Sequence, residues 1–168
     1  MRKEPLRILG INPGTKYLGL AVFQNRSLFD WRVKRLDGKW SKDKIDKAIG
    51  VISDHVDLYD LNTVALKELH PARSSKNLRL LVSRINVLAR QKKLRISQFS
   101  IKELEKFLLE EVKYNKKNLA EKMAVDYPCL IHELEKENTN KNSYNQRTFE
   151  AVALGAACFQ KSLEAKRV

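Results

Sequence analysis

The stretch Ile8-Leu9-Gly10-Ile11-Asn12-Pro13-Gly14-Thr15-Lys16-Tyr17-Leu18-Gly19-Leu20-Ala21-Val22-Phe23 decides the fold of this chain. Two apolar runs flank a Pro-Gly pair, which is typical of two buried strands joined by a tight turn. Asn12 is the polar residue at which the first run meets the turn. The stretch therefore predicts one strand over 6–12 and a second strand over 17–24 that returns beside it.

After this hairpin, the sequence predicts an alternation of strands and helices. Further strands are expected at 27–36, 63–66 and 94–99, and helices are expected over 41–59, from Ser74 or Ser75, from Ser100, over 115–127 and over 147–163, with a polar loop at 136–143. An antiparallel meander followed by crossover helices predicts an α/β fold with a five-stranded mixed sheet flanked by helices. Crossover connections would place the fourth and fifth strands parallel to the first.

The size of the chain suits one folded domain. Its 168 residues are 43% hydrophobic, so we expect a single domain over 1–168. No apolar run approaches the ~20 residues of a membrane helix, and the first residues lack the apolar core of a signal peptide. Cys129 and Cys158 both lie in apolar helical patterns. Two buried thiols and a cytoplasmic protein are therefore expected.

The charge of the chain points to a polyanionic partner. Thirty-three Lys and Arg residues oppose twenty Asp and Glu residues, which gives a formal net charge of +13. Neutralising nucleic-acid phosphates releases condensed counterions, and this release favours binding by basic proteins. A soluble basic protein without such a partner would have the same composition, so charge alone does not decide between the two.

The hairpin at 8–22 and the segment 147–157 resemble the RuvC-type Holliday junction resolvases and, more broadly, the RNase H-like nucleases. The order of the expected elements extends this resemblance over nearly the whole chain. The resemblance implies an RNase H-like fold that binds branched DNA, and a symmetric homodimer by analogy. It also implies clustered carboxylates that hold two Mg²⁺ or Mn²⁺ ions, which activate a water for phosphodiester cleavage.

The positions of the family's acids are mostly not acidic in this chain. The resemblance places them at Asn12, at Lys67 with Glu68 beside it, and at Arg147 and Glu150 on the last helix. Side chains alternate along a strand, so Glu68 would normally point away from the face of Lys67. Arg147 and Glu150 are three residues apart and could pair with each other. Glu150 is the single acid that matches the family pattern cleanly.

The sequence alone is compatible with two functional hypotheses for this site. In the first, the chain is a pseudo-nuclease in which Lys67 and Arg147 grip a phosphate directly. In the second, it is a metal-dependent Holliday junction endonuclease that places its ions on Glu68, Glu150 and the carbonyl of Asn12. Asn12 would also suit a cap of the Pro-Gly turn, and a deliberate Asp-to-Asn replacement would look identical. A nucleotide-handling or interaction domain is less suited, because the chain has no room for a second domain.

The loop after the fourth expected strand predicts contact with a nucleic-acid backbone. It combines hydroxyl groups, basic side chains and the start of a helix. The candidate binding residues are His70, Arg73, Ser74, Ser75 and Lys76, together with Lys16 in the first turn. An ordinary N-capped loop would have the same composition. Trp40 and Tyr114 lie beside lysines and could stack on unpaired bases.

Overall fold

The computed structural model describes residues 4–110, 112–140 and 143–166. Its strands are β1 (Arg7–Asn12), β2 (Tyr17–Gln24), β3 (Ser27–Arg35), β4 (Thr63–Lys67) and β5 (Arg95–Phe99). Its α-helices are α1 (Lys42–Leu58), α2 (Lys76–Gln91), α3 (Ile101–Leu104), α4 (Lys116–Asp126), α5 (Ile131–Asn140) and α6 (Ser143–Ala165). A π-helical turn spans Glu105–Leu109, and a 3-10 turn spans Pro128–Leu130.

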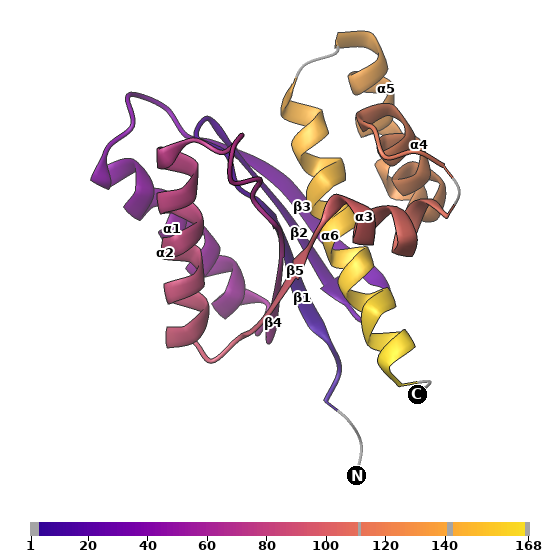
Figure 1. Ribbon diagram of the computed structural model, residues 1–168, viewed down its shortest axis with the longest axis horizontal. Coiled ribbons are helices and arrows are strands. Elements are labelled where there is room, and N and C mark those ends of the chain that lie inside the picture. The colour runs from indigo at the N-terminus through magenta and orange to yellow at the C-terminus, as the bar shows by residue number, and fades with distance from the viewer. Residues whose placement is uncertain (1–3, 111, 141–142, 167–168) are drawn as a thin grey trace.

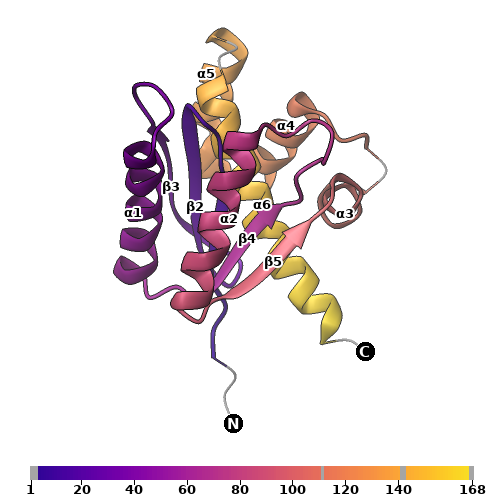
Figure 2. The ribbon, with the colours of Figure 1, turned by 60° about the vertical axis from the view of Figure 1, so that its left-hand side comes forward.

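The five strands form one mixed sheet in the order β3-β2-β1-β4-β5. The first three strands pair antiparallel, whereas β4 runs parallel to both β1 and β5. This confirms the predicted α/β architecture and places β1, which ends at Asn12, at the centre of the sheet. Helices α1 and α2 cover one face of the sheet, and α3 to α6 lie on the other (Figures 1 and 2). None of the described helices is both long and apolar enough to span a membrane.

Alternation along the central strands assigns each residue to one face. Leu9 and Ile11 of β1 belong to the core beneath α1 and α2, and Ile8 belongs to the core on the α6 side. Because side chains alternate with a period of two, Asn12 also faces α6. In β4, Ala65 lies in the α6-side core, so Lys67 projects to the same side as Asn12.

Helix α6 lies against the sheet closely enough to exclude side chains from it. A Cβ atom at Gly10 would collide with the carbonyl oxygen of Ala151, and one at Gly19 would lie 2.5 Å from the carbonyl oxygen of Arg147. Gly19 is paired with Asn12 across the β1–β2 ladder. The absence of side chains at these positions lets α6 lie close to the sheet (Figure 1). Arg147 and Glu150 of this helix therefore reach Asn12 at the end of β1.

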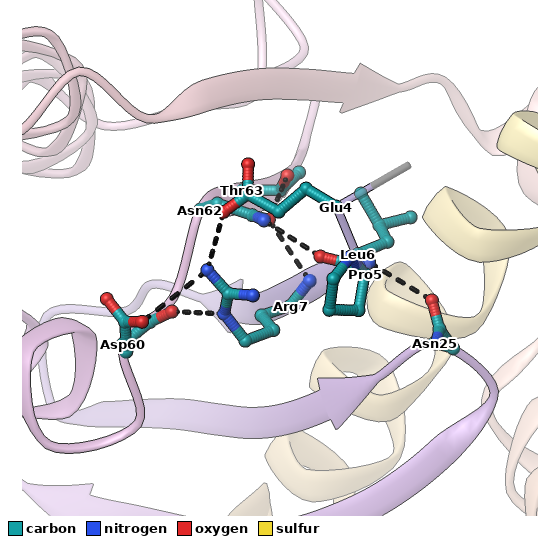
Figure 3. Close-up of polar contacts among 8 residues, drawn as sticks. All are labelled: Glu4, Pro5, Leu6, Arg7, Asn25, Asp60, Asn62 and Thr63. Atoms are coloured by element: carbon teal, nitrogen blue, oxygen red, sulfur yellow. Dashed lines mark hydrogen bonds and ion pairs between the residues drawn. The ribbon is translucent and has the colours of Figure 1, made fainter. Parts of the chain in front are cut away.

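Polar contacts at the opposite end of the sheet hold the start of β1 in register (Figure 3). The side-chain oxygen of Asn62 accepts a hydrogen bond from the backbone N–H of Arg7 at 3.0 Å. The Asn62 amide nitrogen donates to the carbonyl oxygen of Pro5 at 2.9 Å. The guanidinium of Arg7 pairs with Glu4 at 2.8 Å and donates to the carbonyl oxygen of Asp60. These bonds tie β1 to the connection that leads into β4.

Two expectations from the sequence were wrong. The polar segment expected as a loop at 136–143 is helical through Asn140 in α5, and α6 begins at Ser143 rather than at 147; residues 141 and 142 lie outside the described residues. Polarity alone does not end a helix, and this segment contains neither Gly nor Pro. Cys129 is exposed in the 3-10 turn after Pro128, whereas Cys158 is buried as expected.

Candidate nucleic-acid interface

A pocket of about 240 Å³ lies where β1 and β4 end, on the side of the sheet that faces α6. We call it the Asn12 pocket. Five separate segments contribute to it: the ends of β1 and β4, and the starts of α2, α4 and α6. Its lining residues are Asn12, Pro13, Lys67, Leu69, Leu78, Lys116, Gln146, Arg147 and Glu150. Four of the five positions that the family resemblance assigned to acids therefore meet in one pocket.

Asn12 links the two candidate residues of α6. Its amide nitrogen donates a hydrogen bond to Oε2 of Glu150 at 2.7 Å, and its amide oxygen accepts one from a guanidinium nitrogen of Arg147 at 3.4 Å. Among the described residues no direct ion pair joins Arg147 to Glu150, although their spacing allows one. The Asn12 side chain, only 7% exposed, lies between them instead.

The end of β4 contributes Lys67 to the pocket but not Glu68. Lys67 is half-buried, while Glu68 is exposed and lies outside the pocket lining. The backbone N–H of Glu68 donates to the carbonyl oxygen of Phe99 at 2.8 Å. The parallel ladder to β5 thus continues past Lys67, and strand alternation turns Glu68 away from α6.

Sequence reasoning missed Gln146 and Lys116 as residues of the pocket. Gln146 is 4% exposed, and neither polar atom of its side chain has a hydrogen-bond partner among the described residues. Gln146 was not predicted to lie on this helix, because the apolar pattern indicates a start at 147 and α6 begins about one turn earlier, at Ser143. Lys116 begins α4 and is one of three lysines around Tyr114 in the run 113–117. This run of lysines is the one feature of the sequence that points to Lys116, and it does not indicate which of its members lies in the pocket.

Tyr114 is a further neighbour of Glu150. Its phenol is partly buried against the α6-side core. Burial raises the pKa of the Tyr114 hydroxyl well above its usual range, and the negative charge of Glu150 raises it further. A tyrosine hydroxyl is protonated at neutral pH in any case, and these two effects extend its role as a hydrogen-bond donor to alkaline pH.

The donor set of the Asn12 pocket fits an oxyanion rather than a divalent cation. Lys67, Lys116 and Arg147 oppose the single carboxylate of Glu150, so three positive charges against one negative leave a formal charge of +2. Among the described residues, no group of three His, Cys, Asp or Glu side chains is arranged to hold a metal ion. Mg²⁺ and Mn²⁺ need several hard oxygen ligands and surrounding negative charge, which these residues do not provide.

The loop before α2 borders the pocket, because Leu78 in the first turn of α2 lines it. Its hydroxyl groups support the loop itself: the Ser75 hydroxyl oxygen accepts from the N–H of Leu78 at 3.1 Å, and the Ser74 hydroxyl oxygen accepts from Arg79 at 3.5 Å. His70 accepts at Nδ1 from the N–H of Ala72 at 3.2 Å. The other two candidate residues of this loop, Arg73 and Lys76, have exposed side chains.

No protein-family model and no curated protein matches the chain. Solved structures do. The structure of RuvC from Thermus thermophilus superimposes with a TM-score of 0.72 over 95% of this chain and 97% of that one, at 15% identity. T. thermophilus RuvC in complex with a Holliday junction substrate gives a TM-score of 0.71 over 94% and 96%, also at 15% identity. The likeness confirms the RNase H-like fold that RuvC shares.

Proposed function

We propose that this chain is a RuvC-like nucleic-acid-binding protein that recognises branched or structured DNA without metal-dependent cleavage. The Asn12 pocket is the observation that carries the proposal. It lies at the positions where the family resemblance expects clustered acids, yet it gathers Lys67, Lys116 and Arg147 around one carboxylate. Such a site favours a phosphate and disfavours the cations that cleavage requires.

Each residue of the pocket has its own role in binding a phosphate. Lys67 and Lys116 supply mobile ammonium groups, and Arg147 supplies a planar guanidinium suited to phosphate oxygens. Gln146 adds an amide that is buried and unpaired among the described residues; a phosphate oxygen would satisfy its N–H donors. Glu150 and Asn12 hold Arg147 in place through the amide bridge.

The nature of the ligand rests on charge and on fold. A net charge of +13 favours a polyanion, and RuvC of T. thermophilus, which has this fold, has been solved with a Holliday junction substrate. We therefore infer a four-way junction, or DNA of comparable branching, as the ligand. The symmetric homodimer that the family resemblance implies stays a prediction.

Binding is best tested by fluorescence anisotropy with a labelled four-way junction and a duplex of the same length. The wild-type chain should prefer the junction. Lys67→Ala and Lys116→Ala should each weaken binding and lower the slope of log K against log salt by about one, as expected for one lost phosphate contact. Lys47→Ala is the matched control, because Lys47 is an equally charged but exposed residue of α1 outside the pocket. Equal loss in the control would contradict a specific role of the pocket.

Cleavage is tested on the same junction with Mg²⁺ or Mn²⁺. We expect none. Cleavage by the wild-type chain that Glu150→Gln abolishes would overturn the proposal in favour of an endonuclease with a rearranged site.

A further inference from the structure

A second pocket, of about 470 Å³, lies on the other side of the β1–β2 turn from the Asn12 pocket. We call it the Trp40 pocket. Residues from four segments line it, among them Lys16, Arg35, Asp37, Trp40, Lys44 and Asn77. The sequence had singled out Trp40 and Lys16, and the phosphate site described above uses neither.

Lys44 is the unusual residue of this pocket, because it is a buried cation without a carboxylate partner among the described residues. Its side chain is 7% exposed. The ammonium donates to the carbonyl oxygen of Gly38 at 2.9 Å and lies 5.9 Å from the centre of the Trp40 ring. Within the described part of the chain, no acidic oxygen lies within the 4.0 Å that defines an ion pair with it. A buried charge without a counter-ion is costly, so an anionic ligand would stabilise it.

The acid of the pocket does not offset this charge. Asp37 pairs with Arg35 at 2.7 Å, and both side chains are largely exposed. The pair is neutral as a unit, which leaves the charges of Lys16 and Lys44 in excess around an indole ring. A planar aromatic group beside unpaired ammonium groups suits a ligand that has both a flat ring and a phosphate.

The two pockets are adjacent along the backbone of the chain. Pro13 lines the Asn12 pocket, and Thr15 lines the Trp40 pocket. In the same way, Leu78 lines the first pocket and Asn77 the second. The β1–β2 turn and the first turn of α2 thus form a shared wall, so one ligand strand can reach both pockets.

We propose that the Trp40 pocket binds one unpaired nucleotide of the strand whose backbone occupies the Asn12 pocket. Its base lies against the Trp40 indole, and its phosphate lies near Lys44 and Lys16. The inference rests on the proposed nucleic-acid binding and adds to it a preference for unpaired nucleotides, such as those at the open centre of a branched junction.

The test uses Trp40 as its own reporter. In a Trp31→Phe background, Trp40 is the remaining indole of the chain. A single-stranded deoxythymidine oligonucleotide should quench its fluorescence, and a blunt duplex of equal length should not. Trp40→Ala should weaken single-strand binding roughly tenfold, in line with the loss of one stacked base. Lys44→Met should also weaken it, because it removes a phosphate contact. Lys47→Met, at an exposed position of the same helix, should leave binding unchanged, and thermal melting identifies any variant that fails to fold.

The milder Trp40→Phe keeps a ring in the pocket and should retain most of the affinity. If junction binding is intact but the oligonucleotide neither quenches Trp40 nor loses affinity in Trp40→Ala, the Trp40 pocket is not a nucleotide site. Equal quenching by free deoxythymidine monophosphate and by the oligonucleotide would also overturn the proposal, because the pocket would then bind nucleotides independently of a strand. If the wild-type chain bound no DNA at all, the proposed function itself would be wrong.

Discussion

The side-chain amide of Asn12 donates a 2.7 Å hydrogen bond to the carboxylate of Glu150. The opposite end of the same amide accepts from Arg147 at 3.4 Å. The neutral amide of Asn12, which has a donor end and an acceptor end, therefore connects both Glu150 and Arg147 of α6 to the central strand. An aspartate at this position would satisfy Arg147 but would face Glu150 with a second negative charge, so the site is built around an amide.

The first prediction concerns Asn12→Asp, which places two carboxyl groups at hydrogen-bond distance. Like charges this close raise the pKa of the pair, which takes up a proton instead of ionising fully. Because Lys67, Lys116 and Arg147 remain, we expect no cleavage of a four-way junction with Mg²⁺ or Mn²⁺. The raised pKa has a definite sign in stability: relative to Asn12→Ala, the folded variant loses stability as the pH rises and the proton is released.

Thermal unfolding of Asn12→Asp at pH 5 and pH 8 measures this effect, with Asn12→Ala as the matched control. The alanine variant loses the same hydrogen bonds, about 1–3 kcal/mol of stability, but has no added carboxyl to titrate. Restored cleavage in Asn12→Asp would show that the other basic residues do not prevent metal binding.

A second prediction compares the two ends of α2. Lys76 lies at the start of the helix, next to the Asn12 pocket, and Arg90 lies near its end. The 16 residues of the helix span ~24 Å, so the two variants remove equal charge at distant places. Lys76→Ala should weaken junction binding several-fold at low salt and lower the salt slope by about one. Arg90→Ala should change neither, and titrations at two salt concentrations separate the cases. A matched loss in both would indicate a diffuse charge effect.

The sequence predicts those parts of this site that depend on local patterns, and it misses those that depend on the packing of distant segments. The period-two alternation in β4 is a local pattern, so the sequence could assign Lys67 and Glu68 to opposite faces. The family resemblance, rather than any local pattern, suggested that Asn12 and Lys67 belong to one site. The bridging role of Asn12 depends on how closely α6 approaches the sheet, whereas helix periodicity shows only that Arg147 and Glu150 could pair directly. Gln146 and Lys116 enter the pocket through the packing of α4 and α6, which has no local signature.

A third prediction tests the close approach of α6. In Gly19→Ala the new methyl group would lie 2.5 Å from the carbonyl oxygen of Arg147, so the helix must move. We expect a loss of about 1–3 kcal/mol in the free energy of unfolding, typical of overpacking, together with weaker junction binding because Arg147 is displaced. Gly50→Ala is the control: it lies on exposed α1 with open space around it. That change should stabilise the protein by about 0.5–1 kcal/mol, and chemical denaturation measures both. Unchanged stability in Gly19→Ala would contradict the contact.

The last prediction uses two tyrosines as probes of alkaline stability. Burial raises the pKa of Tyr127 to about 12, and burial together with the charge of Glu150 raises the pKa of Tyr114 further. Because both values lie above the ordinary 10.0, the unfolded chain releases these protons first. The contribution of these two tyrosines to the free energy of unfolding is therefore fully present below pH 10. It is lost as the pH rises through their pKa values in the folded protein. Ultraviolet absorbance of tyrosinate during a pH titration should show Tyr114 and Tyr127 as late-titrating groups, alongside Tyr59, whose pKa is also raised by burial. Glu150→Gln removes the charge beside Tyr114, so it should lower the pKa of that tyrosine and leave Tyr127 unchanged. Tyr114→Phe identifies which late step belongs to which residue. If Glu150→Gln moved neither step or both together, Tyr114 would not be a neighbour of the Asn12 pocket.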